Sequence, residues 1–432
     1  GQVRLDGVSD YLRQYRQDAW ESYSRSTLPN PKDEAWRRTD ISKLQPGRFH
    51  VLSAEEEAGL AALPSGVVEG WKRAQSAGWL AIAPGRVQGQ VDPALTAQGV
   101  IFSDLESAER EHASLFERRW GTLVHSSESK FAAMTAALER LGAVLYVPRG
   151  VQIDKPLNSF IWGPGAGAAH FSHLLVWLEE DASATLVHEW ASPQDEQGEA
   201  LHGGLVEVYQ APGSTLNFIE LQAWGENVWN FTHERAHLER DAHIEWTVAA
   251  LGSGVTKTFS DLDLVGEGSH GQVSGFYFIG DRQHLDYDTQ QNHLAPHTTS
   301  NLLYKGALLG SSESIWQGMI YVAPGAIKTD GYQANRNLVL SKDARADSLP
   351  GLEILADDVR CSHGATVGKV DREQLFYLMS RGIPEKDAVR LIVEGFFDEI
   401  MARIPEETVR GRLHQDIGQR MARAEAEEAF GS

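Results

Sequence analysis

The sequence contains a single cysteine, Cys361, among its 432 residues. One thiol cannot close a disulfide within the chain, which is typical of a reducing compartment, so we expect a cytoplasmic protein. It also cannot complete a cysteine-based metal centre, because iron–sulfur clusters and structural zinc usually take about four ligands. No apolar run approaches the roughly 18 residues of a membrane-spanning helix, and the first residues lack the apolar segment of a signal peptide. We therefore expect neither a membrane span nor an export signal.

Positive charge is also scarce, since 39 Lys and Arg stand against 60 Asp and Glu and give a formal net charge of −21. An acidic surface repels phosphate backbones and anionic lipids, so nucleic acids and membrane surfaces are disfavoured as partners. Hydrophobic residues nevertheless make up 42% of the chain and include 12 tryptophans, enough for a large ordered interior. At this length two or three structural units are expected.

Three patterns follow one another along the chain. Residues 1–125 have apolar positions at helical spacing with short strand-like stretches between them, which predicts a mostly helical N-terminal domain. Residues 126–368 are predicted to form a β core, because short alternating apolar stretches are separated by small polar turns from about Ala143 onward. Residues 369–432 return to helical spacing, with Asp371 as a helix N-cap, and are predicted to form a C-terminal helical domain.

Turns in the middle region recur at a nearly constant spacing. Six of them are marked by Asp181, Gly213, Asp241, Gly268, His297 and Gly325. The spacings are 32, 28, 27, 29 and 28 residues. A step of roughly 30 residues with no helical pattern between the turns indicates a solenoid of stacked strands, that is, a β-helix. A β-sandwich or barrel is the competing fold, because turns at half this spacing would suit it as well.

The segment HERAH (233–237) matches the H-E-x-x-H motif of zinc proteases, which requires a helix. Its flanks, VWNFT and IEWTVAAL, are rich in β-branched and aromatic residues and favour a strand instead. In a strand His233 and His237 would lie about 13 Å apart, too far to share one ion. A zinc metalloprotease is therefore kept only as a remote alternative. The segment GSGVTKT (252–258) lacks the glycine before the lysine of a phosphate loop, so no nucleotide is expected to bind this chain.

Cys361 and His363 stand two residues apart in CSHGA (361–365). Residues i and i+2 of a strand point to the same side, so a thiol and an imidazole would project together. Such a pair suits iron, zinc or copper. An inert buried cysteine is the alternative that the residue types alone leave open.

The sequence around this pair resembles the C-terminal hallmark of the SufB/SufD family, the scaffolds of SUF iron–sulfur cluster assembly. The strings that carry the resemblance are NLVLS, LEILADDV, CSHGATVG, LFYLMSRGI, the mid-chain DYDTQQNHLAPHTTSNLLYKG and the N-terminal LPNPKDEAWRRTD. The single cysteine, and CSHGATVGKV in place of an EHEATTSKI-like string, are similar to the SufD branch. A SufB-like chain of the same system is the alternative.

The resemblance implies a mainly β fold, a right-handed parallel β-helix flanked by helical terminal domains. It also implies a non-catalytic scaffold that pairs with a SufB-like chain and docks a SufC-like ATPase through residues 369–432. Cys361 and His363 would then contribute half of a site, shared with SufB, for a transient iron–sulfur cluster. A homodimer of the isolated chain stays open. 

The C-terminal region has an apolar stripe at helical spacing, formed by Val389, Ile392, Phe396 and Ile400. We expect part of this stripe to pack on the β-helix and part to receive the ATPase. Phe397 is expected to be exposed on the docking part.

Overall fold

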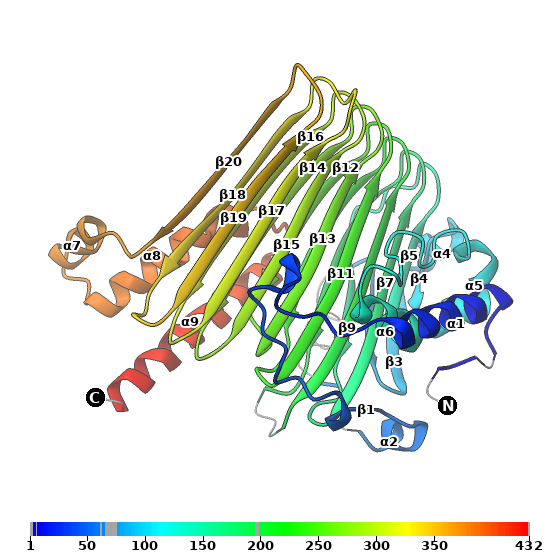
Figure 1. Cartoon of the computed structure of the whole chain (residues 1–432), viewed down its shortest axis with the longest axis horizontal. Coiled ribbons are helices and arrows are strands. Elements are labelled where there is room, and N and C mark those ends of the chain that lie inside the picture. Colours follow the sequence, from blue (N-terminus) through cyan, green and yellow to red (C-terminus); the bar gives the residue numbers. More distant parts are fainter. Residues whose placement is uncertain (1–2, 6, 61–62, 65–75, 195–197, 431–432) are drawn as a thin grey trace.

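The computed structural model shows two long β-sheets that face each other, with the chain passing from one to the other at every turn (Figure 1). The predicted mainly β solenoid with helical regions at both ends is confirmed, and the sandwich or barrel alternative is wrong. Eight successive pairs of strands, from β5–β6 to β19–β20, form the stacked rungs. The described residues are 3–5, 7–60, 63–64, 76–194 and 198–430.

We call the two sheets the odd sheet and the even sheet after their strand numbers. The odd sheet contains, in spatial order, β4 (Ile101–Asp104), β5 (Leu141–Val147), β7 (Ala168–Leu178), β9 (Ala200–Gln210), β11 (Val228–Leu238), β13 (Val255–Leu264), β15 (His284–His293), β17 (Glu313–Val322) and β19 (Arg345–Ile354), with β1 (His50–Val51) beside β7. The even sheet contains β3 (Arg86–Val91), β2 (Gly78–Ala83), β6 (Leu157–Trp162), β8 (Ser183–Ala191), β10 (Thr215–Ala223), β12 (His243–Ala250), β14 (His270–Ile279), β16 (Thr299–Leu308), β18 (Asp330–Val339) and β20 (Arg360–Gly368). All neighbours are parallel except the first pair of each sheet, β4–β5 and β2–β3.

Helices lie on both sides of the solenoid, and several of them cover the outer faces of the sheets. On the N-terminal side these are α1 (Asp10–Arg25), α2 (Ala54–Gly59), α4 (Pro93–Ala97), α5 (Leu105–Phe116) and α6 (Lys130–Leu138), with the short 3-10 turns η1 (Glu34–Trp36) and η2 (Pro46–Arg48). On the C-terminal side they are α7 (Arg372–Ser380), α8 (Glu385–Met401) and α9 (Glu407–Phe430). α1 and α6 lie over the odd sheet, and α8 and α9 lie over the even sheet (Figure 1).

The turns from each odd strand to the next even strand explain the sequence period. Each contains at least one residue with a positive φ, a conformation that Gly, Asp and Asn adopt more readily than other residues. From β7 to β20 these residues are Asp181, Gly213, Asp241, Gly268, His297, Lys328 and Asp358. Adjacent turns are hydrogen-bonded to one another, for example from Asp181 N to Pro212 O at 3.0 Å. Five of the six predicted markers occupy this position, and Gly325 lies three residues before Lys328 because the turn after β17 is longer.

The side chains between the two sheets form the largest apolar core, which includes the buried Trp190, Trp246 and Trp316. A second core lies outside the even sheet, where α8 and α9 pack on it. Phe397 of α8 belongs to this second core and is fully buried, with its ring 5.2 Å from that of Phe276 on β14. The prediction that Phe397 is exposed is therefore wrong, because the outer face of the even sheet is itself apolar and α8 covers it.

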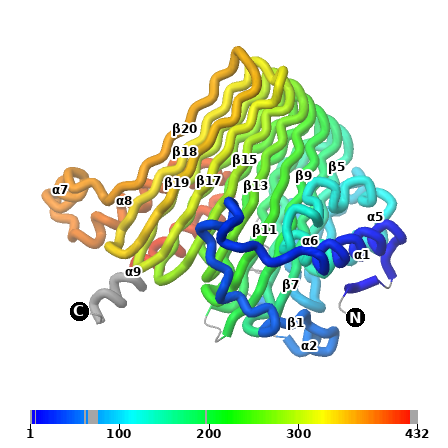
Figure 2. Tube along the Cα trace, in the orientation of Figure 1, coloured from blue at the N-terminus to red at the C-terminus, as the bar shows by residue number. Residues whose placement is uncertain are grey.

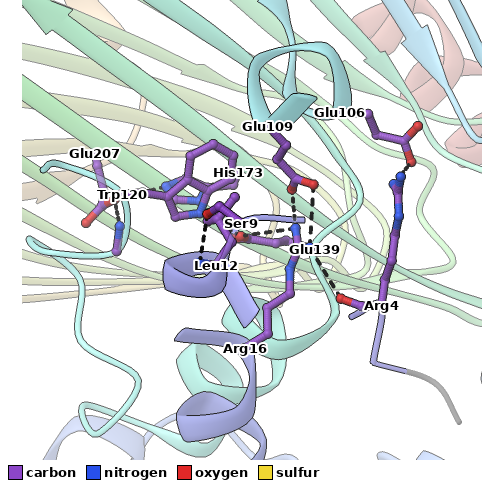
Figure 3. Close-up of polar contacts among 11 residues, drawn as sticks. Arg4, Ser9, Leu12, Arg16, Glu106, Glu109, Trp120, Glu139, His173 and Glu207 are labelled. Atoms are coloured by element: carbon purple, nitrogen blue, oxygen red, sulfur yellow. Dashed lines mark hydrogen bonds and ion pairs between the residues drawn. The ribbon is translucent and has the colours of Figure 1, made fainter. Parts of the chain in front are cut away.

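A buried charge network holds the N-terminal helices on the odd sheet (Figure 3). His173 of β7 places Nδ1 2.8 Å from Glu139 Oε2 and Nε2 3.1 Å from Glu207 Oε2. Glu207 also accepts hydrogen bonds from the backbone N–H groups of Gly121, Leu123 and Val124, and Arg16 of α1 pairs with Glu109 of α5. Burial alone would lower the pKa of His173, but the two glutamates raise it to about 10. His173 is therefore an imidazolium at neutral pH.

Candidate functional site at the end of the solenoid

Cys361 and His363 lie on β20, the last strand of the even sheet (Figure 2). The strand register places both in columns of side chains that point into the solenoid. The column that ends in His363 runs through Leu186, Phe218, Trp246, Val273, Leu302 and Gln333. Its first five members belong to the apolar core, so His363 occupies a core position in the rung that has no further rung beyond it.

Cys361 is half-buried beside Ile320 and Val322 of β17. Burial raises the pKa of its thiol, the N–H of Gly331 lowers it, and the Asp330 carboxylate raises it again. The net rise leaves the thiol protonated at neutral pH until a metal or a cation binds. His363 is exposed. The two side chains thus share one face of the strand at different depths.

The layer behind Cys361 contains an imidazole, that of His293. The strand partner of Cys361 is Gly331, and a Cβ there would lie 3.3 Å from both Cys361 Sγ and His293 Nε2. Cys361 Sγ and His293 Nε2 therefore lie no more than twice 3.3 Å apart. His293 is buried, bonded to the hydroxyls of Thr298 at 2.7 Å and Ser300 at 2.8 Å, and burial lowers its pKa to about 4. The sequence feature that could have indicated this contact is Gly331, a glycine at a strand position whose side chain would point into the solenoid.

In the part of the chain that the structure describes, no further strand follows the terminal rung. β19 and β20 are the edge strands of their sheets, so one side of each backbone has no strand partner. Apolar side chains are exposed on this rung and its turn, at Leu352, Ile354, Leu355 and Val367. On the odd sheet the 27–49 segment reaches as far as β17, through Arg38 and Gln317. The solenoid therefore ends in an apolar edge that a partner can complete.

The two candidate ligands at this end, Cys361 and His363, do not make a complete metal site by themselves. Within the described ranges, no group of three or more His, Cys, Asp or Glu is arranged to hold a metal ion. Cys361 and His363 offer one soft sulfur donor and one imidazole nitrogen, a combination that suits iron. Any cluster held here needs further ligands from outside this chain or from bound thiol or sulfide.

The HERAH segment lies on β11, so its side chains alternate between the two faces of the odd sheet. His233 points outward, with Nε2 2.9 Å from Ser129 Oγ. Glu234 points inward and is hydrogen-bonded to Glu220, and burial raises the pKa of both carboxyls, that of Glu220 to about 7. The zinc-protease interpretation is therefore wrong, because the motif never forms one face of a helix.

A separate apolar surface lies on the C-terminal helices. We call it the α7 surface, formed by Phe376, Tyr377, Met379 and Leu391. Phe376 is 73% exposed and Tyr377 57% exposed, and α7 has no buried residue. In Figure 1 α7 projects beyond the end of the solenoid. Large apolar side chains left this open are typical of a protein–protein contact. None of the described helices is long and apolar enough to cross a membrane.

Comparison with known proteins agrees with this architecture. Residues 160–396 match the family described as "SUF system FeS cluster assembly, SufBD core domain", and residues 5–158 match the "SufBD protein N-terminal region". The iron–sulfur cluster assembly protein SufB of Bacillus subtilis is 32% identical over 316 residues, which cover 72% of this chain and 67% of that protein. An iron–sulfur cluster assembly SufBD family protein of Staphylococcus haemolyticus is 31% identical over 316 residues, with the same coverage.

These matches and the solenoid define a scaffold-type protein of SUF iron–sulfur cluster assembly. The chain belongs to the SufB/SufD family.

Proposed function

We propose that this chain is the SufD-like subunit of the cytoplasmic SUF assembly complex, a scaffold without catalytic activity of its own. It pairs with a SufB-like chain at the uncapped end of the solenoid, and the two chains together hold the nascent iron–sulfur cluster. Cys361 and His363 are the ligands that this chain supplies. The observation that carries the proposal is their position, in inward columns of the last rung with an exposed apolar edge around them.

The α7 surface is the proposed dock for a SufC-like ATPase. Its exposed aromatic and thioether side chains lie on a helix that has no buried residue, so they are available to a partner. ATP chemistry would then reside in that partner, in keeping with a chain whose GSGVTKT segment lacks the features of a phosphate loop. Hydrolysis at this dock would act on the scaffold through α8, which packs on β14 and β16.

His363→Ala tests the shared site. The variant should still form the complex with the SufB-like and SufC-like proteins, because His363 is exposed and its removal should not disturb the fold. Anaerobic reconstitution with iron and sulfide, followed by visible absorption, should show loss of most of the cluster. Ser362→Ala is the matched control, since it removes an outward side chain from the same strand and should leave assembly unchanged. Normal cluster formation in His363→Ala would refute the shared site.

A SufB-like role for this chain is the second candidate, favoured by the similarity to the SufB protein of Bacillus subtilis. The two roles differ in what the lone cysteine must do. A SufB-like chain would have to form cluster and accept sulfur with Cys361 alone, since no other thiol exists in the sequence. Mixing the purified chain with authentic SufB and, separately, with authentic SufD decides between them, because the complementary partner should give the heterocomplex.

A further inference from the structure

One interior column of the solenoid, the column that leads to His363, changes from apolar to polar one strand before its end. The column leading to His363 is apolar through Leu302 and then becomes Gln333, which is fully buried. The neighbouring inward positions of β18 are Asn335 and Asn337, also buried. Buried amides destabilise a fold unless they are hydrogen-bonded, so their presence here calls for partners.

Gln333 spans the interior from the even sheet to the odd sheet. Its Nε2 donates to Gly318 O of β17 at 3.2 Å and to Gly351 O of β19 at 2.8 Å. One side chain therefore ties the terminal odd strand to the rung before it. Its own position on β18 lies directly beside His363 on β20.

Asn335 and Asn337 make a second tie to the same strand. Asn337 Nδ2 donates to Asn335 Oδ1 at 2.6 Å and to Ser348 Oγ of β19 at 3.3 Å, and Ser348 in turn bonds Asn335. The group is anchored further back by Tyr277 of β14, whose hydroxyl donates to Asn337 Oδ1 at 2.6 Å. Tyr277 reaches across the intervening strand only because the residue there is Gly306, where a Cβ would collide with its ring.

These hydrogen bonds can hold the last rung in place where apolar packing cannot. The apolar side chains of the last rung must stay exposed for a partner, so they cannot also hold the rung in place by packing. Directional hydrogen bonds from the layer behind can do so, and they fix one geometry where apolar contacts would allow several. We infer that Gln333, supported by Asn335 and Asn337, is a positioning residue that holds the β19–β20 rung so that His363 and Cys361 face a partner's ligands. The inference rests on the proposed function of that pair.

Gln333→Met tests the inference, because methionine has a similar length and volume but donates no hydrogen bond. Leu302→Met is the matched control, one strand earlier in the same column with no hydrogen bond to lose. In the full chain, hydrogen exchange should become on the order of tenfold faster in 345–354 and 360–368 alone, the size expected for one or two lost hydrogen bonds. Exchange elsewhere and the Tm should stay close to those of the unmodified chain.

The same variant, assembled with its SufB-like and SufC-like partners, should form several-fold less cluster in anaerobic reconstitution. Unchanged exchange in the terminal rung would overturn the inference, and so would faster exchange throughout the chain with a lower Tm, which marks an ordinary core residue. His363→Ala, measured in parallel, separates the two ideas. If His363→Ala blocks the cluster and Gln333→Met does not, the positioning role fails alone. If neither blocks it, the proposed site itself is wrong.

Discussion

Replacing His173 with glutamine removes the central cation of the buried network while keeping a side chain that can hydrogen-bond (Figure 3). The folded pKa of about 10 exceeds the ordinary histidine value of 6.5, so the folded state binds the proton more tightly than the unfolded state. At about 1.4 kcal/mol per pKa unit, this preference contributes roughly 4 kcal/mol at pH 7. Breaking a buried ion pair from one side costs about 3–5 kcal/mol, which agrees in size.

The sign of the pH dependence follows from the raised pKa. The contribution of His173 is complete below the unfolded pKa, declines as the pH rises above it, and is lost as the pH passes about 10. Urea unfolding followed by tryptophan fluorescence should therefore show a large stability difference between His173→Gln and the unmodified chain at pH 6 that shrinks steadily toward pH 10. His125→Gln, at an exposed histidine, is the control and should show little difference. A loss below about 1 kcal/mol, or a difference independent of pH, would refute the charged network.

The remaining predictions concern the C-terminal helices and the solenoid interior. Phe376→Asp on the α7 surface should abolish binding of the SufC-like ATPase in a pull-down, with little change in Tm. Phe397→Asp should instead unfold the chain or lower its Tm strongly, because Phe397 is fully buried. Retained binding in Phe376→Asp would mean that the ATPase docks elsewhere. Glu220→Gln should raise the free energy of unfolding at pH 8, measured by urea unfolding. Burial raises the pKa of Glu220 to about 7, so at pH 8 the unmodified folded chain either carries a buried carboxylate charge or holds a proton that the unfolded chain has released. That gain should shrink as the pH falls and vanish below the ordinary carboxyl pKa of about 4.5, where Glu220 is protonated in both the folded and the unfolded state, and a gain that persists there would point to packing instead.

The repeat of turns and the pairing of Cys361 with His363 could be predicted because both are local patterns in the sequence. A turn that needs a positive φ selects Gly or Asp at a fixed spacing, so markers such as Asp241 and Gly268 reveal the rungs directly. The i, i+2 spacing of Cys361 and His363 fixes their shared face as soon as the segment is a strand.

Other features depend on which distant segments meet, which local patterns do not encode. Glu139 lies between α6 and β5, His173 lies on β7 and Glu207 on β9, and nothing in their local sequences shows that they converge. An apolar stripe shows that α8 needs a partner but not which one, and so Phe397 was assigned to the wrong surface. Gln333 looks like any polar residue of a strand until the register places it in a core column.

The two ends of the solenoid differ, and this difference limits how such chains can assemble. At the N-terminal end the sheets stop at the short β4 and at the polar antiparallel β3, features that discourage further strand pairing. At the other end β19 and β20 present open, apolar edges. When two solenoids meet through their open ends, only the β3 and β4 edges, which do not favour strand pairing, stay exposed. If the proposed pairing through the open ends holds, assembly along the axis stops at two chains, and a solenoid of stacked parallel strands does not extend into a fibre.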